Sequence, residues 1–396
     1  TAGIPPLAGA FVAGREEVGR TFPDLAPILA HLAENADVVK AGEEVRAAMR
    51  TEPPGRPIYD PVLHYIDGQV PAAAALNPAY RLVPFMNRDE ELTDVVRWAM
   101  QGNQTAYLLT GGGGMGKTRL LIEACVDLWA QGCRAGFLRP RCDFTALRTQ
   151  LSGNSRFLII IDYAERRVDD LKALCRLIAE MQATHRIRLA LLARTGGAWI
   201  THLTDDHAAR AFLGDDAIVE RQLKPVAPEK VDHVHLDRWQ VLEQAVRAFA
   251  SCRERKSVDS IMQALRGRID IDRKEYDFIL DLLMEGWVPV FGSDQSSNPM
   301  EEIIRWERRY LGGLAPESVT ADTMMEILAW IYTKEGAATR KEALALLTEC
   351  PSLAGLSAPL IAKIGEVFHN CYDGPFWLNP VQPDRVGLAI VQKYSL

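Results

Sequence analysis

The chain has 396 residues, and 45 basic against 52 acidic side chains give it a net charge of −7. This length predicts two or three domains at about 150 residues each, and a composition of 48 % hydrophobic and 24 % charged residues excludes a largely disordered chain. The acidic balance argues against a protein whose main partner is a nucleic-acid backbone, and no apolar run approaches the roughly 18 residues that span a membrane.

Residues 1–80 are rich in Ala and Pro and show no chemistry. One helix is expected near residues 25–49, and the prolines of residues 53–57 interrupt any regular element because proline lacks a backbone donor. We therefore predict an N-terminal helical or linker segment over 1–80.

Between residues 81 and 225, apolar strands alternate with helices of 3.6-residue periodicity. This alternation predicts an α/β domain with a parallel sheet covered on both faces. Strands are expected at 106–110, 134–138, 157–161, 187–193 and 217–223, and the clearest helices at 117–131 and 168–181.

After Pro225 the strands disappear, so residues 226–316 are predicted to form an all-α helical domain. Helices are expected at 229–253, 258–265 and 275–285, and a further one from Pro299 to the glycine pair 312–313. Asn298 is expected to cap that last helix, with Arg308 and Arg309 in its final turn, where the helix dipole favours positive charge.

Residues 317–396 form a third block. Helices at 321–333, 340–350 and 358–370 precede Asp373 and Gly374, which we expect to turn a short hairpin whose second arm contains residues 376–378. Three helices followed by a hairpin is the outline of a winged-helix domain. The helix before the wing carries one lysine, so protein packing is favoured over DNA binding, and nucleic acid is not expected as a partner.

The strongest motif is a full match to G-x-x-x-x-G-K-[ST], the phosphate-binding P-loop. It consists of Gly111, Gly112, Gly113, Gly114, Met115, Gly116, Lys117 and Thr118. The glycines let successive N–H groups surround phosphate oxygens, and the following helix directs its positive end at them. Lys117 is expected to neutralise the β and γ phosphates and Thr118 to ligate Mg²⁺.

Residues that the sequence lacks argue against two alternative ligands, a dinucleotide and a guanine nucleotide. The same glycines fit the dinucleotide pattern G-x-G-x-x-G, but no acidic residue follows about 20 positions later to bind a ribose. No N-K-x-D element for reading guanine follows the P-loop, which favours ATP and ADP as the ligands.

Two further strand ends carry polar residues. The apolar strand 157–161 ends at Asp162, which is expected to hold the Mg²⁺ shell, and Glu165 is the candidate general base for the attacking water. The alternative for Glu165 is an acid that merely opens the next helix. The strand 187–193 ends at Arg194, expected either to sense the γ-phosphate or to pair with a local carboxylate.

Seven cysteines are spread along the chain without a C-x-x-C pair, which is typical of reduced thiols in a cytoplasmic protein. The histidines have no metal-ligand spacing supported by Cys or Glu, so no zinc site is expected.

Taken together, these residues resemble the bacterial STAND family of signal-transduction ATPases. The likeness begins at residues 84–92, similar to the family motif Phe-x-Gly-Arg-x-x-Glu-Leu, in which Arg88 matches the arginine and Asn87 replaces the glycine. It continues through the P-loop, Asp162 and Arg194 into the later stretches 306–310 and 380–385. The fold class it implies is an ASCE/AAA+-like P-loop NTPase followed by a helical and a winged-helix domain, with Arg88 in the nucleotide site.

The resemblance implies a switch. ADP would hold the winged helix against the NTPase domain in a closed monomer, and ATP would open it to self-associate, in antiphage defence or regulation. The trigger would be sensed by a region outside this chain. In eukaryotic relatives a winged-helix histidine touches the ADP phosphate, and Asn379 stands at that position here. The apolar residues 376–378 are expected to pack against the NTPase domain.

Two other functions remain open. One is a constitutive DNA-associated ATPase, and the other is a winged-helix transcription regulator gated by ATP.

Overall fold

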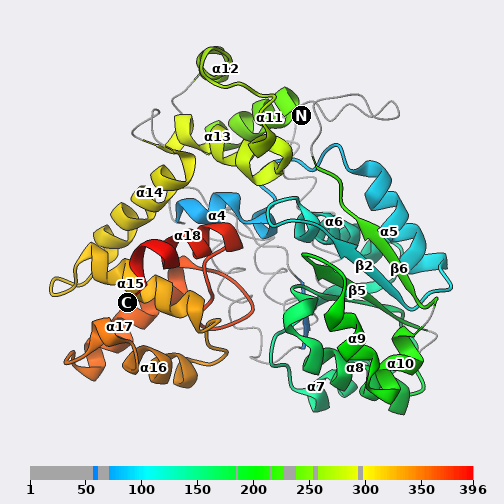
Figure 1. The fold of residues 1–396 in the computed structure, drawn as a ribbon. Coiled ribbons are helices and arrows are strands. Elements are labelled where there is room, and N and C mark those ends of the chain that lie inside the picture. Colours follow the sequence, from blue (N-terminus) through cyan, green and yellow to red (C-terminus); the bar gives the residue numbers. More distant parts are fainter. Residues whose placement is uncertain are drawn as a thin grey trace, which may run out of the picture. The chain divides into compact units, whose positions relative to one another are not determined.

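The computed structural model describes residues 57–60, 71–183, 186–214, 216–225, 238–252, 257–292 and 298–395. The chain divides between Pro54 and Gly55, and the unit that begins at Gly55 is described here (Figure 1). The helix expected near residues 25–49 lies outside the described residues. None of the helices in the described ranges is long and apolar enough to cross a membrane.

A six-stranded, mostly parallel sheet forms the α/β part, in the order β1-β3-β4-β5-β2-β6. The five predicted strands are confirmed. They are β2 (Ala106–Thr110), β3 (Arg134–Leu138), β4 (Phe157–Ile161), β5 (Ile187–Ala193) and β6 (Ile218–Gln222). Because β5 lies between β2 and β4, the P-loop strand and the strand ending at Asp162 are one strand apart.

The sixth strand, β1 (Ile58–Tyr59), was not predicted. It pairs antiparallel with β3, whereas the other neighbours in the sheet run parallel. Gly136 of β3 permits this pairing, since a Cβ there would lie 2.7 Å from the Tyr59 carbonyl oxygen. Two residues beside a proline run carry no periodicity that would mark a strand.

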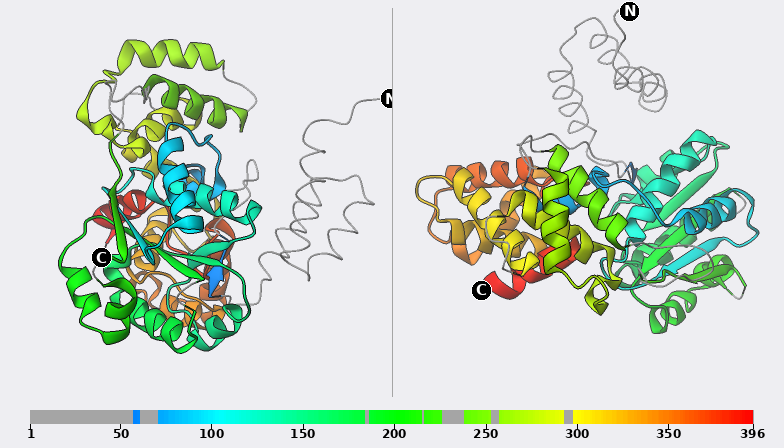
Figure 2. Two further views of the ribbon diagram at one scale, coloured as in Figure 1. Left: turned by 90° about the vertical axis from the view of Figure 1, so that its right-hand side faces the viewer. Right: turned by 90° about the horizontal axis from the view of Figure 1, so that it is seen from above.

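Helices cover both faces of the sheet, as Figures 1 and 2 show. Alternate strand residues point to opposite faces, so Leu108 and Ile159 lie in one hydrophobic core and Tyr107 and Leu158 in another. The covering helices are α5 (Asp89–Gln101), α6 (Lys117–Ala130), α7 (Phe144–Gln150), α8 (Val168–Glu180), α9 (Ala198–Thr204) and α10 (His207–Leu213).

The described residues of the next block are helical, as predicted, with two differences; residues 229–237 of the first expected helix lie outside the described residues. Its helices are α11 (Arg238–Ser251), α12 (Val258–Arg268), α13 (Ile279–Phe291) and α14 (Pro299–Leu314). The single helix expected over 275–285 is instead a 3-10 turn, η4 (Lys274–Asp277), followed by an extended Phe278 and then α13. Helix α14 continues through the glycine pair, so Arg308 and Arg309 do not lie in its last turn. Gly312 is needed for packing, since a Cβ there would lie 2.8 Å from the Ala321 Cβ.

The third block contains α15 (Ala321–Thr333), α16 (Arg340–Thr348), α17 (Ala358–Cys371) and α18 (Asp384–Tyr394). The predicted hairpin around Asp373 and Gly374 does not form. Leu378 makes an isolated antiparallel bridge with Ala337 instead. The winged-helix outline is therefore three helices with a wing reduced to one bridge, and α18 packs on α15 and α14.

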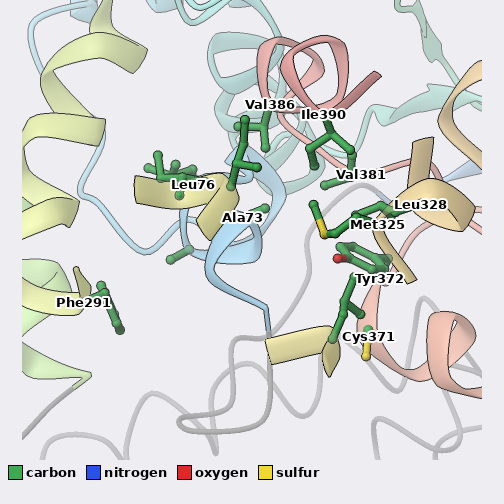
Figure 3. Close-up of a cluster of buried hydrophobic side chains, with 14 of the residues drawn as sticks. Ala73, Leu76, Phe291, Met325, Leu328, Cys371, Tyr372, Val381, Val386 and Ile390 are labelled. Carbon is green, nitrogen blue, oxygen red and sulfur yellow. The ribbon is translucent and has the colours of Figure 1, made fainter. Parts of the chain in front are cut away.

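A short segment before the sheet completes this core. It contains α4 (Ala72–Leu76) and the 3-10 turn η2 (Pro78–Tyr80). Ala73 and Leu76 lie in the same hydrophobic cluster as residues of α13, α15 and α18 (Figure 3). Within the predicted linker, helix α4 is thus part of the hydrophobic core. The boundaries 81–225, 226–316 and 317–396 remain a division by element type.

Candidate nucleotide-binding site

The P-loop joins β2 to α6 and has the backbone of an anion cradle. Gly114 and Gly116 have φ values of +88° and +96°, which glycine adopts at little cost. No side chain caps the N-terminus of α6, so its first N–H groups remain available to an anion. The Lys117 Nζ folds back over the loop and donates to the carbonyl oxygens of Gly111 at 2.6 Å and Gly112 at 3.1 Å. Burial lowers the pKa of Lys117.

Thr118 and Asp162 meet at the base of this loop. The Thr118 hydroxyl donates to Asp162 Oδ2 at 2.9 Å, and Asp162 Oδ1 accepts from the Tyr163 N–H at 3.0 Å. Burial raises the pKa of Asp162, against the lowering effect of these hydrogen bonds. One hydroxyl and one carboxylate fit Mg²⁺, which completes its octahedron with water and substrate phosphates. Across the described ranges, no three His, Cys, Asp or Glu side chains converge on a metal position.

Glu165 and Arg194 lie on the same side of the cavity. Glu165 Oε1 accepts from the Arg194 backbone N–H at 3.3 Å. Its other oxygen, Oε2, is buried and accepts no hydrogen bond from the described part of the chain. This oxygen has no hydrogen bond that would have to break before it accepts a proton from water, as a general base does.

Arg194 also pairs with a carboxylate, although not a local one. Its Nη2 donates to Asp384 Oδ2 at 2.8 Å, and Asp384 is the first residue of α18. Tyr332 of α15 donates its hydroxyl to the same Asp384 side chain. Arg194 is thus ion-paired, though with a distant rather than a local carboxylate, and it lines the cavity; its sensing of a γ-phosphate stays a prediction.

These residues surround a cavity of about 190 Å³. Apolar side chains from the segment before α5 and from α11 and α13 supply much of its lining, which suits a nucleotide base. They are Leu82, Val83, Phe85, Met86, Val241, Ile279, Leu280 and Leu283.

Asn87 and Arg88 line this cavity as well. Asn87 has a left-handed backbone with φ +59°, and its buried Nδ2 finds no acceptor within the described residues. Arg88 is 3 % exposed and donates to Glu91 at 2.8 Å and to the Lys224 carbonyl at 2.6 Å. Arg88 thereby ties the segment 84–92 to the end of β6.

The structure corrects two expectations about residues 376–379. Asn379 is absent from the cavity lining, because its side chain closes its own loop: Oδ1 accepts from Phe376 N–H, and Nδ2 donates to the carbonyls of Tyr372 and Phe376. Trp377 stacks on His369 of α17, with ring centroids 4.6 Å apart. It packs within its own block rather than against the NTPase domain.

Four C-terminal residues do line the cavity, Gln382, Pro383, Asp384 and Arg385, and the two charged ones were not predicted from the sequence. They lie in the stretch 380–385 that carried part of the family likeness, and an Asp-Arg pair directly after a proline was the available signal. Their partners, Arg194 and Asp281, are 190 and 104 residues away in sequence, so sequence spacing could not identify them.

No protein-family model matches the sequence, and no curated protein is significantly similar to it. Among solved structures, the chain is similar to Cdc6p from Pyrobaculum aerophilum, with 13 % identity, 81 % of this chain and 98 % of that chain covered, and a TM-score of 0.37. The Aeropyrum pernix ORC1 protein in complex with DNA is 13 % identical, with 81 % of this chain and 96 % of that chain covered and a TM-score of 0.33. AMPPCP-bound DnaA from Aquifex aeolicus is 14 % identical, with 73 % of this chain and 88 % of that chain covered and a TM-score of 0.34. The α/β P-loop fold followed by helical blocks rests on this chain's own strand order, and its function is argued from its own residues.

Proposed function

We propose that this chain is an ATP-binding and ATP-hydrolysing switch of the STAND type, in which the C-terminal helix α18 closes the nucleotide site. The observation that carries the proposal is the ion pair between Arg194, at the end of β5, and Asp384, at the start of α18. It links the α/β part to the winged-helix block at the cavity that also contains the P-loop.

The residues of the site divide the work between binding and hydrolysis. The P-loop N–H groups and Lys117 bind the phosphates. Thr118 and Asp162 would hold Mg²⁺, which neutralises phosphate charge when it is bound. Glu165 orients the attacking water and accepts its proton through the free carboxylate oxygen.

Switching follows from the charges beside Arg194. In the closed arrangement its guanidinium is neutralised by Asp384. The additional phosphate of ATP would bring negative charge close to the Asp384 carboxylate, and the repulsion between these two anions would weaken the ion pair, which ADP leaves intact. A ligand shifts such an equilibrium only by its differential affinity for the two arrangements. Opening would expose the surface that α18 covers and allow self-association. The cycle would be slow and regulatory and would run in the cytoplasm, and antiphage defence is one setting in which such switches act.

The Asp384→Asn variant tests this proposal, because it removes the charge of the ion pair and keeps the side-chain size. Asp322→Asn is a matched control, since Asp322 pairs with Arg308 on the exposed surface of α14 and α15. Light scattering is measured on each protein with ADP and with a non-hydrolysable ATP analogue.

We expect the Asp384 variant to self-associate with the ATP analogue more readily than the wild type, and the Asp322 variant to behave like the wild type. The proposal fails if the Asp384 variant and the wild type have the same mass with both nucleotides.

A further inference from the structure

We propose that Arg385 of α18 is a phosphate-binding residue of the nucleotide site, which acts on the phosphates beyond the α-phosphate. This inference rests on the proposed nucleotide-binding function. It adds a residue from the C-terminal block to the cradle formed by the P-loop.

Arg385 lies directly against the P-loop. Its Nη1 is 3.3 Å from the position that a Cβ on Gly114 would occupy, and its Cγ is 3.8 Å from the corresponding position on Gly113. The Leu280 N–H donates to the Gly114 carbonyl oxygen at 3.1 Å. The outer part of the loop is therefore held between α13 and the Arg385 side chain, and Arg385 belongs to the cavity lining.

The Asp281 carboxylate holds the Arg385 guanidinium in this position and leaves some of its N–H donors able to bind a phosphate. Arg385 Nη1 donates to Asp281 Oδ2 at 2.8 Å, and the guanidinium lies 5.7 Å from the centre of the Phe278 ring. A guanidinium carries five N–H donors in a planar fork, so it can keep Asp281 and bind a phosphate oxygen at the same time. Arginine is suited to phosphate for this reason.

The neighbouring residue fixes the direction from which Arg385 approaches. Asp384 is bound by Arg194 and by Tyr332, which anchors the first turn of α18 at the cavity. Arg385, the next residue of α18, then lies against Gly113 and Gly114 of the P-loop. The glycine loop cradles the β-phosphate, so a cation that lies against Gly113 and Gly114 acts on the phosphate that ADP has and AMP lacks.

The test compares nucleotides that differ only in phosphate number. Arg385→Gln and Arg385→Lys are prepared in the full chain, with Arg340→Ala as a control for loss of an arginine, since Arg340 is on α16 and pairs with Glu366. Binding of ADP and of AMP is measured by competition against a fluorescent adenine nucleotide. Circular dichroism checks that each variant is folded.

We expect Arg385→Gln to weaken ADP binding about tenfold to a hundredfold and to leave AMP binding unchanged. Arg385→Lys should retain part of the ADP affinity because it keeps the charge without the fork. Arg340→Ala should match the wild type.

Equal losses for AMP and ADP, or no loss for either, would overturn the role of Arg385. A Lys117→Ala variant separates this failure from failure of the proposed function. If Lys117→Ala loses ADP binding and Arg385→Gln does not, the P-loop binds nucleotide without Arg385. If Lys117→Ala binds ADP like the wild type, the nucleotide-binding function itself is wrong.

Discussion

At the residue scale, the P-loop lysine gives the plainest prediction. Lys117 donates to two loop carbonyls on the cavity side and contributes little to any core, so Lys117→Ala should fold normally and lose ATP binding by about two orders of magnitude or more. Isothermal titration with ATP and circular dichroism measure the two properties. Near-normal affinity in a folded variant would show that this glycine loop does not bind phosphate.

Glu165 gives a second prediction at this scale. Glu165→Gln keeps an Oε1 acceptor for the Arg194 N–H and removes the basic oxygen, so the geometry should survive. We expect ATP binding to be retained and hydrolysis to slow roughly 100-fold, as for a lost general base. Steady-state phosphate release measures the turnover. Unchanged turnover would assign the base to another residue and leave Glu165 as an acid that opens its helical turn.

At the element scale, the short helix α4 depends on one buried carboxylate. Glu307 of α14 is fully buried, accepts from the Ala73 N–H at 2.6 Å and accepts from the Tyr372 hydroxyl at 3.0 Å. Figure 3 shows Ala73 and Tyr372 within the same apolar cluster. Burial raises the pKa of Glu307 to about 7, against the lowering effect of these two bonds.

This pKa predicts a pH dependence of stability. The folded state holds the Glu307 proton between its unfolded pKa of 4.5 and its folded pKa of about 7, whereas the unfolded state has lost it. The free energy of unfolding therefore falls as pH rises through this window, by an amount of the order of 3 kcal/mol for a group of this burial, and the loss is complete above the folded pKa.

Denaturant unfolding of the wild type and of Glu307→Gln at pH 5 and pH 7.5 measures the effect. The glutamine cannot titrate, so its free energy of unfolding should change less between the two pH values than that of the wild type. An identical pH dependence in the two proteins would mean that another group is responsible.

Elements also differ in how far the sequence predicts them. The strands β2 to β6 and helix α6 follow from local apolar periodicity, and five glycines with a Lys-Thr pair identify the P-loop without further context. The break at Phe278 and the missing hairpin could not be predicted locally. Phe278 is extended so that α13 can begin beside the P-loop, and Asn379 satisfies the loop carbonyls that a hairpin would have used.

The same distinction applies within the site. Lys117, Thr118, Asp162, Glu165 and Arg194 were assigned from motif spacing, and the structure brings them to one cavity. Asp384 and Arg385 reach it only through pairing across the fold, which a single sequence does not encode as spacing. Asn379 was assigned to the nucleotide site from its position in the family resemblance alone. Both ends of its side-chain amide form hydrogen bonds within its own loop instead.

At the scale of the whole molecule, charge leads to a prediction about DNA. The chain has a net charge of −7, and α17, the helix before the wing, carries Lys363 as its one lysine or arginine. Neutralising phosphates requires basic side chains and gives a steep dependence of affinity on salt. We therefore expect weak binding to duplex DNA at physiological salt, measured by fluorescence anisotropy across a salt series. Sequence-specific binding with a nanomolar Kd would favour the transcription regulator or the DNA-associated ATPase instead.

Hydrogen exchange in α18 measures the closure of the nucleotide site most directly. The intact chain is compared with ADP and with a non-hydrolysable ATP analogue bound, and peptides covering Asp384–Tyr394 are followed, with the buried strand β4 as an internal reference. Repulsion between the third phosphate and Asp384 beside Arg194 predicts slow exchange in α18 with ADP and faster exchange with the ATP analogue, while β4 stays equally protected in both. Equal protection of α18 with the two nucleotides, or greater protection with the ATP analogue, would contradict a switch that opens at this helix.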